Sequence, residues 1–299
     1  MRGKFPRIMH LVTVTCNRDF NQMLLQAESI SKFVEPCTHY VIVNEPSANL
    51  QFWYNWLSPY YSNHKLFLLQ RIEYNYQELG IDTRNNGTYV GWVLQQLQKL
   101  LIAYHINEDY LVLDSKNFFI NECNINEWEN VLGNYLLINS PAAGDPYRHS
   151  YEYYCETLGT SRDPVYSMVT PFKIERKYIT DCKYFDFYGL GKKLINVLNF
   201  PPSEFLFYSF LVPGNHISFG SDRPMLLKTI ELWEGHYDTD MLAFRDFCDK
   251  ISDKDYKLAS IHRKFLSNAS PAFYKLINSK LKAMGFENMV RPMASDALM

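Results

Sequence analysis

The sequence of 299 residues lacks the motifs of several common enzyme classes. No Gly-x-Gly-x-x-Gly follows its first apolar segment, which argues against a dinucleotide-binding oxidoreductase or a Rossmann methyltransferase. Gly-x-x-x-x-Gly-Lys-Ser/Thr is also absent, and so is a Gly-x-Ser-x-Gly elbow. A P-loop kinase and an α/β-hydrolase are therefore disfavoured.

An excess of charge of one sign is missing too, because 30 Lys and Arg residues face 32 Asp and Glu residues. The formal net charge of −2 gives no electrostatic reason to expect a nucleic-acid partner, which usually requires a basic excess or stripe. No apolar run reaches the 18 residues that suggest a membrane helix, so we expect no integral membrane segment. A neutral surface still allows one small basic pocket for a nucleotide.

Cysteines are few and far apart, and none forms a Cys-x-x-Cys pair or another metal-ligand spacing. In a chain of this length they are typical of reduced thiols in a cytoplasmic protein. The apolar run near the N-terminus is broken and lacks a small-residue cleavage site, so we expect no export signal. The expected location is the cytoplasm.

Apolar segments alternate with helical patterns over the first 120 residues, which predicts an α/β fold with a mostly parallel sheet. The segment Phe20 to Phe33 repeats apolar residues at helical spacing, and Asp19 is placed to cap it. A second helical pattern, from 88 to 106, carries a stripe that we expect to be buried: Val90, Val93, Leu94, Leu97, Leu101 and Tyr104. We predict strands at 7–15, 38–44, 65–70, 109–114 and 134–140, a strand-like stretch at 168–174, a short helix at 50–57, and several helices after about 190.

The stretch LVLDSKNFF, residues 111–119, ends an apolar strand with an acid. Ligands of open α/β sheets bind beyond the carboxyl ends of the strands, so the Asp114 carboxylate should enter such a crevice. Two carboxylates of an Asp-x-Asp turn can hold Mg²⁺ or Mn²⁺, which takes up charge on a leaving diphosphate. Here the second position is Lys116. The other interpretation of Asp-Ser-Lys-Asn is simply a turn or a helix cap.

Five blocks of the sequence together resemble a bacterial and phage family of glycosyltransferases with the GT-A, nucleotide-diphospho-sugar transferase fold. The blocks are LVTVTCNRDF, GWVLQQLQKL, DYLVLDSKNFF, SEFLFYSFLV and ASIHRKFL. The resemblance implies a GT-A-like (Rossmann-like) mixed sheet flanked by helices. Residues 1–122 would form the donor-binding half, and 123–299 would complete the same domain and build a helical acceptor side. The implied partners are a nucleotide-sugar donor and a glycan or small-molecule acceptor.

The resemblance also implies roles for individual residues. The turn from Thr15 through Asn17 to Asp19 would lie near the donor nucleotide. Asp114 would match the first acid of the Asp-x-Asp motif, and Ser203-Glu204 would lie beside the acceptor. The remaining implied donor-site residues are Trp92, Gln96 and Lys99 on one helical face, which could equally be a solvated or interhelical stripe, and His262-Arg263 near the diphosphate.

Lys116 departs from the family pattern and leaves three alternatives. A Mn²⁺ or Mg²⁺ ion could still bind through Asp114, Asn117 or His262 and the donor's own phosphates. The Lys116 ammonium could instead supply the positive charge itself. Finally, catalysis could have been lost, which would leave a silent module that binds a nucleotide or glycan. A nucleotidyltransferase on a similar fold is a more remote alternative.

An inverting transfer needs a carboxylate that takes the proton of the acceptor hydroxyl. Glu204 is the first candidate for this base, and Asp145 and Asp222 are weaker ones. Glu204 also follows Pro202-Ser203 before an apolar run, which is typical of a helix start. The loop 214–224, GNHISFGSDRP, could contact a phosphate or be an ordinary Gly- and Pro-containing turn.

Overall fold

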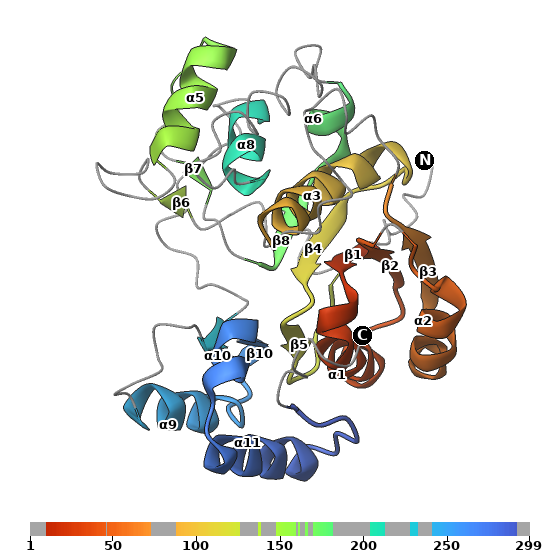
Figure 1. Ribbon diagram of the computed structural model, residues 1–299, viewed down its shortest axis with the longest axis vertical. Coiled ribbons are helices and arrows are strands. Elements are labelled where there is room, and N and C mark those ends of the chain that lie inside the picture. Colours follow the sequence, from red (N-terminus) through yellow and green to blue (C-terminus); the bar gives the residue numbers. More distant parts are fainter. Residues whose placement is uncertain are drawn as a thin grey trace, which may run out of the picture.

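The central feature of the protein, seen in a computed structural model, is a five-stranded sheet with the order β3-β2-β1-β4-β8 (Figure 1). Its strands are β1 (His10–Thr15), β2 (Thr38–Val43), β3 (Lys65–Gln70), β4 (Tyr110–Asp114) and β8 (Phe172–Ile174). The first four run parallel, and β8 pairs antiparallel with β4. The structure describes residues 10–45, 47–72, 88–125, 137–138, 148–159, 161, 165–166, 170–181, 204–212, 228–232 and 241–291.

Helices cover both faces of this sheet because its strands carry apolar residues on both sides. Leu11 and Leu113 belong to a core cluster with α1 (Phe20–Phe33) and α2 (Leu50–Leu57). Their neighbours Val12 and Val112 point to the other face and pack with α3 (Thr88–Leu101). Side chains alternate between the faces of a strand, so continuous apolar runs are what a sheet covered on both sides requires.

The chain reverses its direction of winding between β1 and β4. From β1 it passes through α1 to β2 and through α2 to β3, with both helices on one face. It then crosses by α3 on the opposite face to reach β4, on the far side of β1. The carboxyl ends of β1 and β4 therefore form the topological switch point, where open α/β sheets bind their ligands.

A second sheet joins the central one directly after β4. It has the order β5-β10-β9, with strands β5 (Asn117–Phe119), β9 (Lys228–Leu232) and β10 (Tyr256–Ile261). Only two residues, Ser115 and Lys116, separate β4 from β5, so the turn between them connects the two sheets. The helices near this sheet are α9 (Met241–Lys250), α10 (Arg263–Asn268) and α11 (Pro271–Ala283) (Figure 1).

Three further α-helices of the described residues lie on the α3 side of the central sheet. The α8 helix (Glu204–Leu211) is almost entirely buried and contacts α3, α5 (Arg148–Leu158) and α6 (Arg176–Thr180). Strands β6 (Leu137–Ile138) and β7 (Val165–Tyr166) form a separate antiparallel pair. Three short 3-10 helices complete the set: η1 (Asn17–Asp19), η2 (Ser58–Tyr61) and η3 (Ile102–Tyr104). No helix within the described ranges has the length and apolar character needed to span a bilayer.

The predicted α/β class, a mostly parallel mixed sheet with flanking helices, is confirmed. Two local predictions are wrong. Tyr104 is half exposed: it lies in η3, beyond the end of α3 at Leu101, and its hydroxyl donates to the Ile179 carbonyl at 3.3 Å. Asp19 lies at the N-cap position of α1, but its side chain makes no capping hydrogen bond. Of the predicted strand at 134–140 only Leu137–Ile138 lie within the described residues, where they form β6 outside the central sheet, and β5, β9 and β10 were not predicted.

Candidate functional site

Asp114 ends β4 at the switch point, and the turn after it is fixed by side-chain hydrogen bonds. The Asn117 Oδ1 accepts a bond from the Asp114 backbone N–H at 2.7 Å. On the other side, the Gln26 Nε2 of α1 donates to the carbonyl oxygens of Asp114 and Asn117, at 2.8 and 2.9 Å. The Asp-Ser-Lys-Asn segment is therefore a turn, as one of the two interpretations predicted, and it presents the Asp114 carboxylate at the sheet edge.

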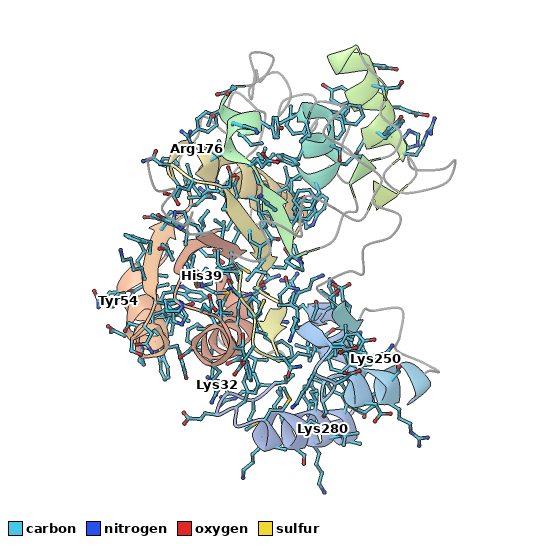
Figure 2. The ribbon with its side chains drawn as sticks, turned by 180° about the vertical axis from the view of Figure 1, so that it is seen from behind. Lys32, His39, Tyr54, Arg176, Lys250 and Lys280 are labelled. Atoms are coloured by element: carbon cyan, nitrogen blue, oxygen red, sulfur yellow. The ribbon has the colours of Figure 1, made fainter. Side chains whose placement is uncertain are left out.

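Gln26 is itself the end of a buried polar chain that crosses the sheet. Its Oε1 accepts from the Thr13 hydroxyl at 2.8 Å. Since that hydroxyl donates to Gln26, the His39 Nε2 at 3.0 Å must donate to Thr13, and the His39 Nδ1 accepts from the Tyr61 hydroxyl. His39 is thus neutral, and burial lowers its pKa to about 3. Its position inside the molecule is seen in Figure 2.

Lys99 of α3 lies between two candidate catalytic acids. Its Nζ is 2.8 Å from the Asp114 Oδ1 and 2.7 Å from the Glu204 Oε1, and only 3% of its side chain is exposed. The Nζ also lies 5.2 Å from the centroid of the Phe205 ring. Burial disfavours the ammonium, but the two carboxylates outweigh burial and raise the pKa of Lys99. The three side chains form a buried ion triad.

The two acids of this triad differ in their surroundings. Against the effect of burial, Lys99 and Lys116 hold the pKa of Asp114 at about 2, so this carboxylate is ionised. Its Oδ2 lies 3.7 Å from the Lys116 Nζ and 3.3 Å from the Thr170 hydroxyl, whose single hydrogen is shared with the closer Asn117 Oδ1 at 2.8 Å. Glu204 begins α8 and is buried, and this burial raises its pKa although Lys99 opposes the shift.

Asp19 and Arg263 extend the cluster toward β1 and α10. The Asp19 Oδ2 accepts from the Ser115 hydroxyl at 2.8 Å, and its Oδ1 lies 3.7 Å from the Arg263 guanidinium. Burial raises the pKa of Asp19, while Ser115 and Arg263 oppose the shift. Because Ser115 stands between Asp114 and Lys116, these contacts connect Arg263 to the charges at the end of β4. The cluster thus includes Asp19, Lys99, Asp114, Lys116, Asn117, Glu204 and Arg263.

The other predicted site residues lie around this cluster. Gln96 places its Oε1 3.5 Å from the Lys99 Nζ and donates to the backbone of Trp92, whose side chain packs against the core. Asn17 uses its backbone N–H to bind the Glu45 carboxylate. Thr15 is buried, and its hydroxyl has no hydrogen-bond partner among the described residues. The backbone N–H of His262 donates to the Leu232 carbonyl. The remaining candidates lie outside the described residues: Asp145, Ser203, Asp222 and the loop 214–224.

The predicted ion ligands can be tested against these contacts. Both Asp114 oxygens are already engaged, and two ammonium groups lie within 4 Å of them. Asn117 directs its oxygen to the Asp114 N–H and the Thr170 hydroxyl, while its buried Nδ2 has no partner in the described part of the chain. In those same parts no three His, Cys, Asp or Glu side chains gather as a metal site would require. As arranged, these side chains do not fit a divalent ion held by the protein.

Three residues of the site were missed by the sequence analysis. Ser115 is the middle residue of the Asp-Ser-Lys turn and Thr170 lies in the strand-like stretch 168–174, but nothing in their spacing indicates that they meet Asp19 and Asp114. Gln26 did leave a signal in the sequence: it is a polar residue three after Met23 and four before Ile30, on the apolar face of the predicted helix, and in the structure it is fully buried. A buried side-chain amide requires hydrogen-bond partners. The backbone carbonyls of a turn that follows a neighbouring strand can supply them, as those of Asp114 and Asn117 do here.

Comparisons with known proteins gave matches only among solved structures. No protein-family model matches the chain, and no curated protein matches it. The galactosyltransferase LgtC in complex with donor and acceptor sugar analogues is 13% identical, with 92% of this chain and 100% of that chain covered and a TM-score of 0.48. Mouse xyloside xylosyltransferase 1 in its apo form is 12% identical, with coverage of 85% and 97% and a TM-score of 0.46. Core-mannan synthase A of Aspergillus fumigatus in a Mn/GDP form is 8% identical, with 69% of each chain covered and a TM-score of 0.43.

Proposed function

We propose that the protein is a glycosyltransferase that moves a sugar from a nucleotide-diphosphate donor to a glycan or small-molecule acceptor. One observation carries the proposal: Asp114 ends the central parallel strand β4 at the switch point, with 24% of its side chain exposed, between the ammonium groups of Lys99 and Lys116. This opposed charge lies at the edge where open α/β sheets bind their ligands. Charge at such an edge suits a ligand that is itself charged.

The donor diphosphate would bind on the cationic side of the cluster. Lys116 and Arg263 have partly exposed side chains, and their positions are fixed by Asp114 and by Asp19. When the bond between the sugar and the diphosphate breaks, its electron pair stays on the phosphate oxygen. Cations placed beforehand at that oxygen stabilise the developing charge, and lysine can act as a point charge for phosphate.

A divalent ion remains the alternative source of this charge. Mn²⁺ or Mg²⁺ would take up charge on the leaving diphosphate when bound. Asp114, Asn117 and His262 are the side chains that would hold the ion. The oxygens of Asp114 and Asn117, however, already accept hydrogen bonds or ion pairs from other groups. The engaged oxygens favour direct stabilisation by Lys116 over a metal.

Glu204 is the proposed base for the acceptor hydroxyl. A base works best when its pKa lies near the working pH, and burial moves the pKa of Glu204 upward, toward that range. Lys99 joins this carboxylate to Asp114, so the base and the donor-binding acid would be held at fixed separation. Asp145 and Asp222 remain candidates for the same role.

A catalytically silent module that binds a nucleotide or glycan is the second candidate. The ion triad favours it, because Asp114 and Glu204 each have a cationic partner before any ligand arrives. Such a module would bind a nucleotide but release no nucleoside diphosphate from any donor sugar. Turnover therefore separates the two functions.

The first test measures thermal unfolding of the protein with UDP, GDP, CDP and their sugars, each with Mn²⁺, Mg²⁺ or EDTA. A ligand at about 100 times its dissociation constant should stabilise the fold by roughly 2.7 kcal/mol. Release of nucleoside diphosphate from the stabilising donor is then measured for the wild type and for Asp114→Ala. Asp255→Ala is the control, because Asp255 is an exposed acid that is not part of the charged cluster. We expect release to be lost in Asp114→Ala alone. Full activity of that variant would overturn the proposal.

A further inference from the structure

The short helix α2 exposes far more aromatic surface than its packing requires. Trp53 and Leu57 are buried and attach the helix to the sheet, whereas Phe52, Tyr54 and Trp56 are exposed by 45, 50 and 52%. Only six large hydrophobic side chains among the described residues are exposed to such a degree, and half of them lie in these two helical turns. Exposed apolar groups that gather in this way usually mark a binding surface.

The rings form a continuous surface that begins at the candidate site. Phe20, the first residue of α1, lies 5.2 Å from Phe52 and 6.0 Å from Trp56 between ring centroids. Phe52 and Trp56 are 6.3 Å apart and tilted. Tyr54 is two residues from both Phe52 and Trp56, so it points away from them on the helix, at the outer edge of the molecule (Figure 2). Phe20 directly follows Asp19, so this surface, here called the α2 platform (Phe20, Phe52 and Trp56), starts beside the charged cluster.

The surroundings of the platform are polar but carry no charge. Gln51 and Asn55 are exposed on the same helix, and the Gln51 amide donates to the Asn55 oxygen at 2.8 Å. Residues 46–64 contain no Asp, Glu, Lys or Arg, although charged residues make up 21% of the chain. Aromatic rings beside amides, without charge, suit a ligand with apolar faces and hydroxyl groups.

We propose that the α2 platform binds a neutral oligosaccharide. The C–H face of a sugar ring packs on an aromatic face, and amides donate to and accept from its hydroxyls. A lipid surface fits less well, because helices that lie in a membrane interface carry Lys or Arg on their polar face, and α2 carries none. The role of this oligosaccharide as the acceptor rests on the proposed transferase function, but its binding does not.

Binding is tested with soluble neutral hexasaccharides, namely maltohexaose, cellohexaose, mannohexaose and chitohexaose, by tryptophan fluorescence and by calorimetry. The probing variant is Phe52→Ala/Trp56→Ala. Phe67→Ala and Tyr104→Ala are matched controls, because these rings are similarly exposed but lie on β3 and η3. We expect at least one hexasaccharide to bind the wild type, with affinity reduced roughly tenfold or more in the double variant and nearly unchanged in the controls.

Several results would overturn the proposal. The wild type could fail to bind every hexasaccharide at about 10 mM. The double variant and the controls could lose hexasaccharide affinity equally. The platform could also mediate association with phosphatidylcholine vesicles or with a second copy of the chain instead of binding a glycan. Asp114→Ala should bind the hexasaccharide normally. If the wild type binds a hexasaccharide but releases no nucleoside diphosphate from any donor, the transferase function is rejected and the glycan-binding platform is kept. If it releases nucleoside diphosphate but the α2 variant binds glycans as the wild type does, the platform is rejected and the transferase function is kept.

Discussion

Replacing Lys99 by methionine tests whether Lys99, Asp114 and Glu204 form a buried ion triad. Methionine keeps the length and apolar character of the stem but removes the charge. The Nζ of Lys99 lies within 2.8 Å of one oxygen from each acid, and its side chain is 3% exposed. Removal therefore leaves two carboxylates without their common partner in the interior. Lysine is poorly replaced here by any neutral residue.

The cost should be large and should depend on pH. Removing one partner of a buried ion pair costs about 3–5 kcal/mol, because the remaining charge is uncompensated. Without Lys99, the pKa of Glu204 should rise further, since this cation opposes the rise that burial causes. A folded-state pKa above the unfolded value stabilises the fold in acid, and this contribution is lost as pH rises through the folded pKa. The free energy of unfolding that Lys99→Met loses should thus be smaller at pH 5 than at pH 8. The difference is about 1.4 kcal/mol for each unit by which the pKa of Glu204 rises within this pH range.

Urea unfolding at pH 5 and pH 8 measures both effects. Lys250→Met is a matched control, because the Lys250 Nζ lies 2.6 Å from the Asp246 Oδ2 in an exposed pair, and exposed pairs contribute about 0–1 kcal/mol. Adding Glu204→Gln to Lys99→Met should recover part of the stability at pH 8. If Lys99→Met costs less than about 1 kcal/mol and its cost is the same at both pH values, the argument for a buried triad fails.

Three further predictions follow from neighbouring contacts. Gln26→Leu should destabilise the protein by at least about 2 kcal/mol in urea unfolding, because it leaves the Asp114 and Asn117 carbonyls without their buried donor; a cost near zero would mean that water replaces the amide. The pKa of His39 is held at about 3 in the fold against 6.5 in the unfolded chain, so stability is lost as pH falls below 6.5. Between pH 8 and pH 5 this loss is about 2 kcal/mol, and it should disappear in His39→Gln; identical profiles of the two proteins would contradict the burial of a neutral imidazole. Lys116→Asp should make donor binding dependent on Mn²⁺, and donor binding by the variant that is unaffected by EDTA would argue against a charge-balancing role for residue 116.

The central sheet was predictable because its strands are apolar on both faces. Runs such as His10–Thr15 and Thr38–Val43 are almost entirely buried, as strands covered on both faces must be, whereas the edge strand Lys65–Gln70 is only partly covered. The second sheet was not predictable in the same way. β5 has only three residues, and β10 reaches it from a position far along the chain, so no local pattern connects them. The exposed Tyr104 shows a similar limit, because helical spacing cannot reveal where α3 tightens into η3.

The charged residues of the candidate cluster could be named from the sequence, but their pairing and their neutral neighbours could not. Asp114, Lys116, Glu204 and Arg263 were named from the sequence, and they do gather with Lys99 at one edge. The sequence placed Lys99 on a helix face toward a donor, whereas the fold places its Nζ between two acids. The reason is that α8, which carries Glu204, follows α3 by more than a hundred residues and packs on it only in the folded protein.

The charges of the cluster give a physical meaning to the lysine at position 116. Counted as ionised, Asp19, Asp114 and Glu204 carry three negative charges, and Lys99, Lys116 and Arg263 carry three positive ones. An acid at position 116 would change the sum from zero to −2, which is the charge that one divalent cation neutralises. Buried and half-buried charges are stable only when they are compensated. A lysine at this position therefore balances the charge of the cluster within the chain, and we expect residue 116 to decide whether the site needs a metal.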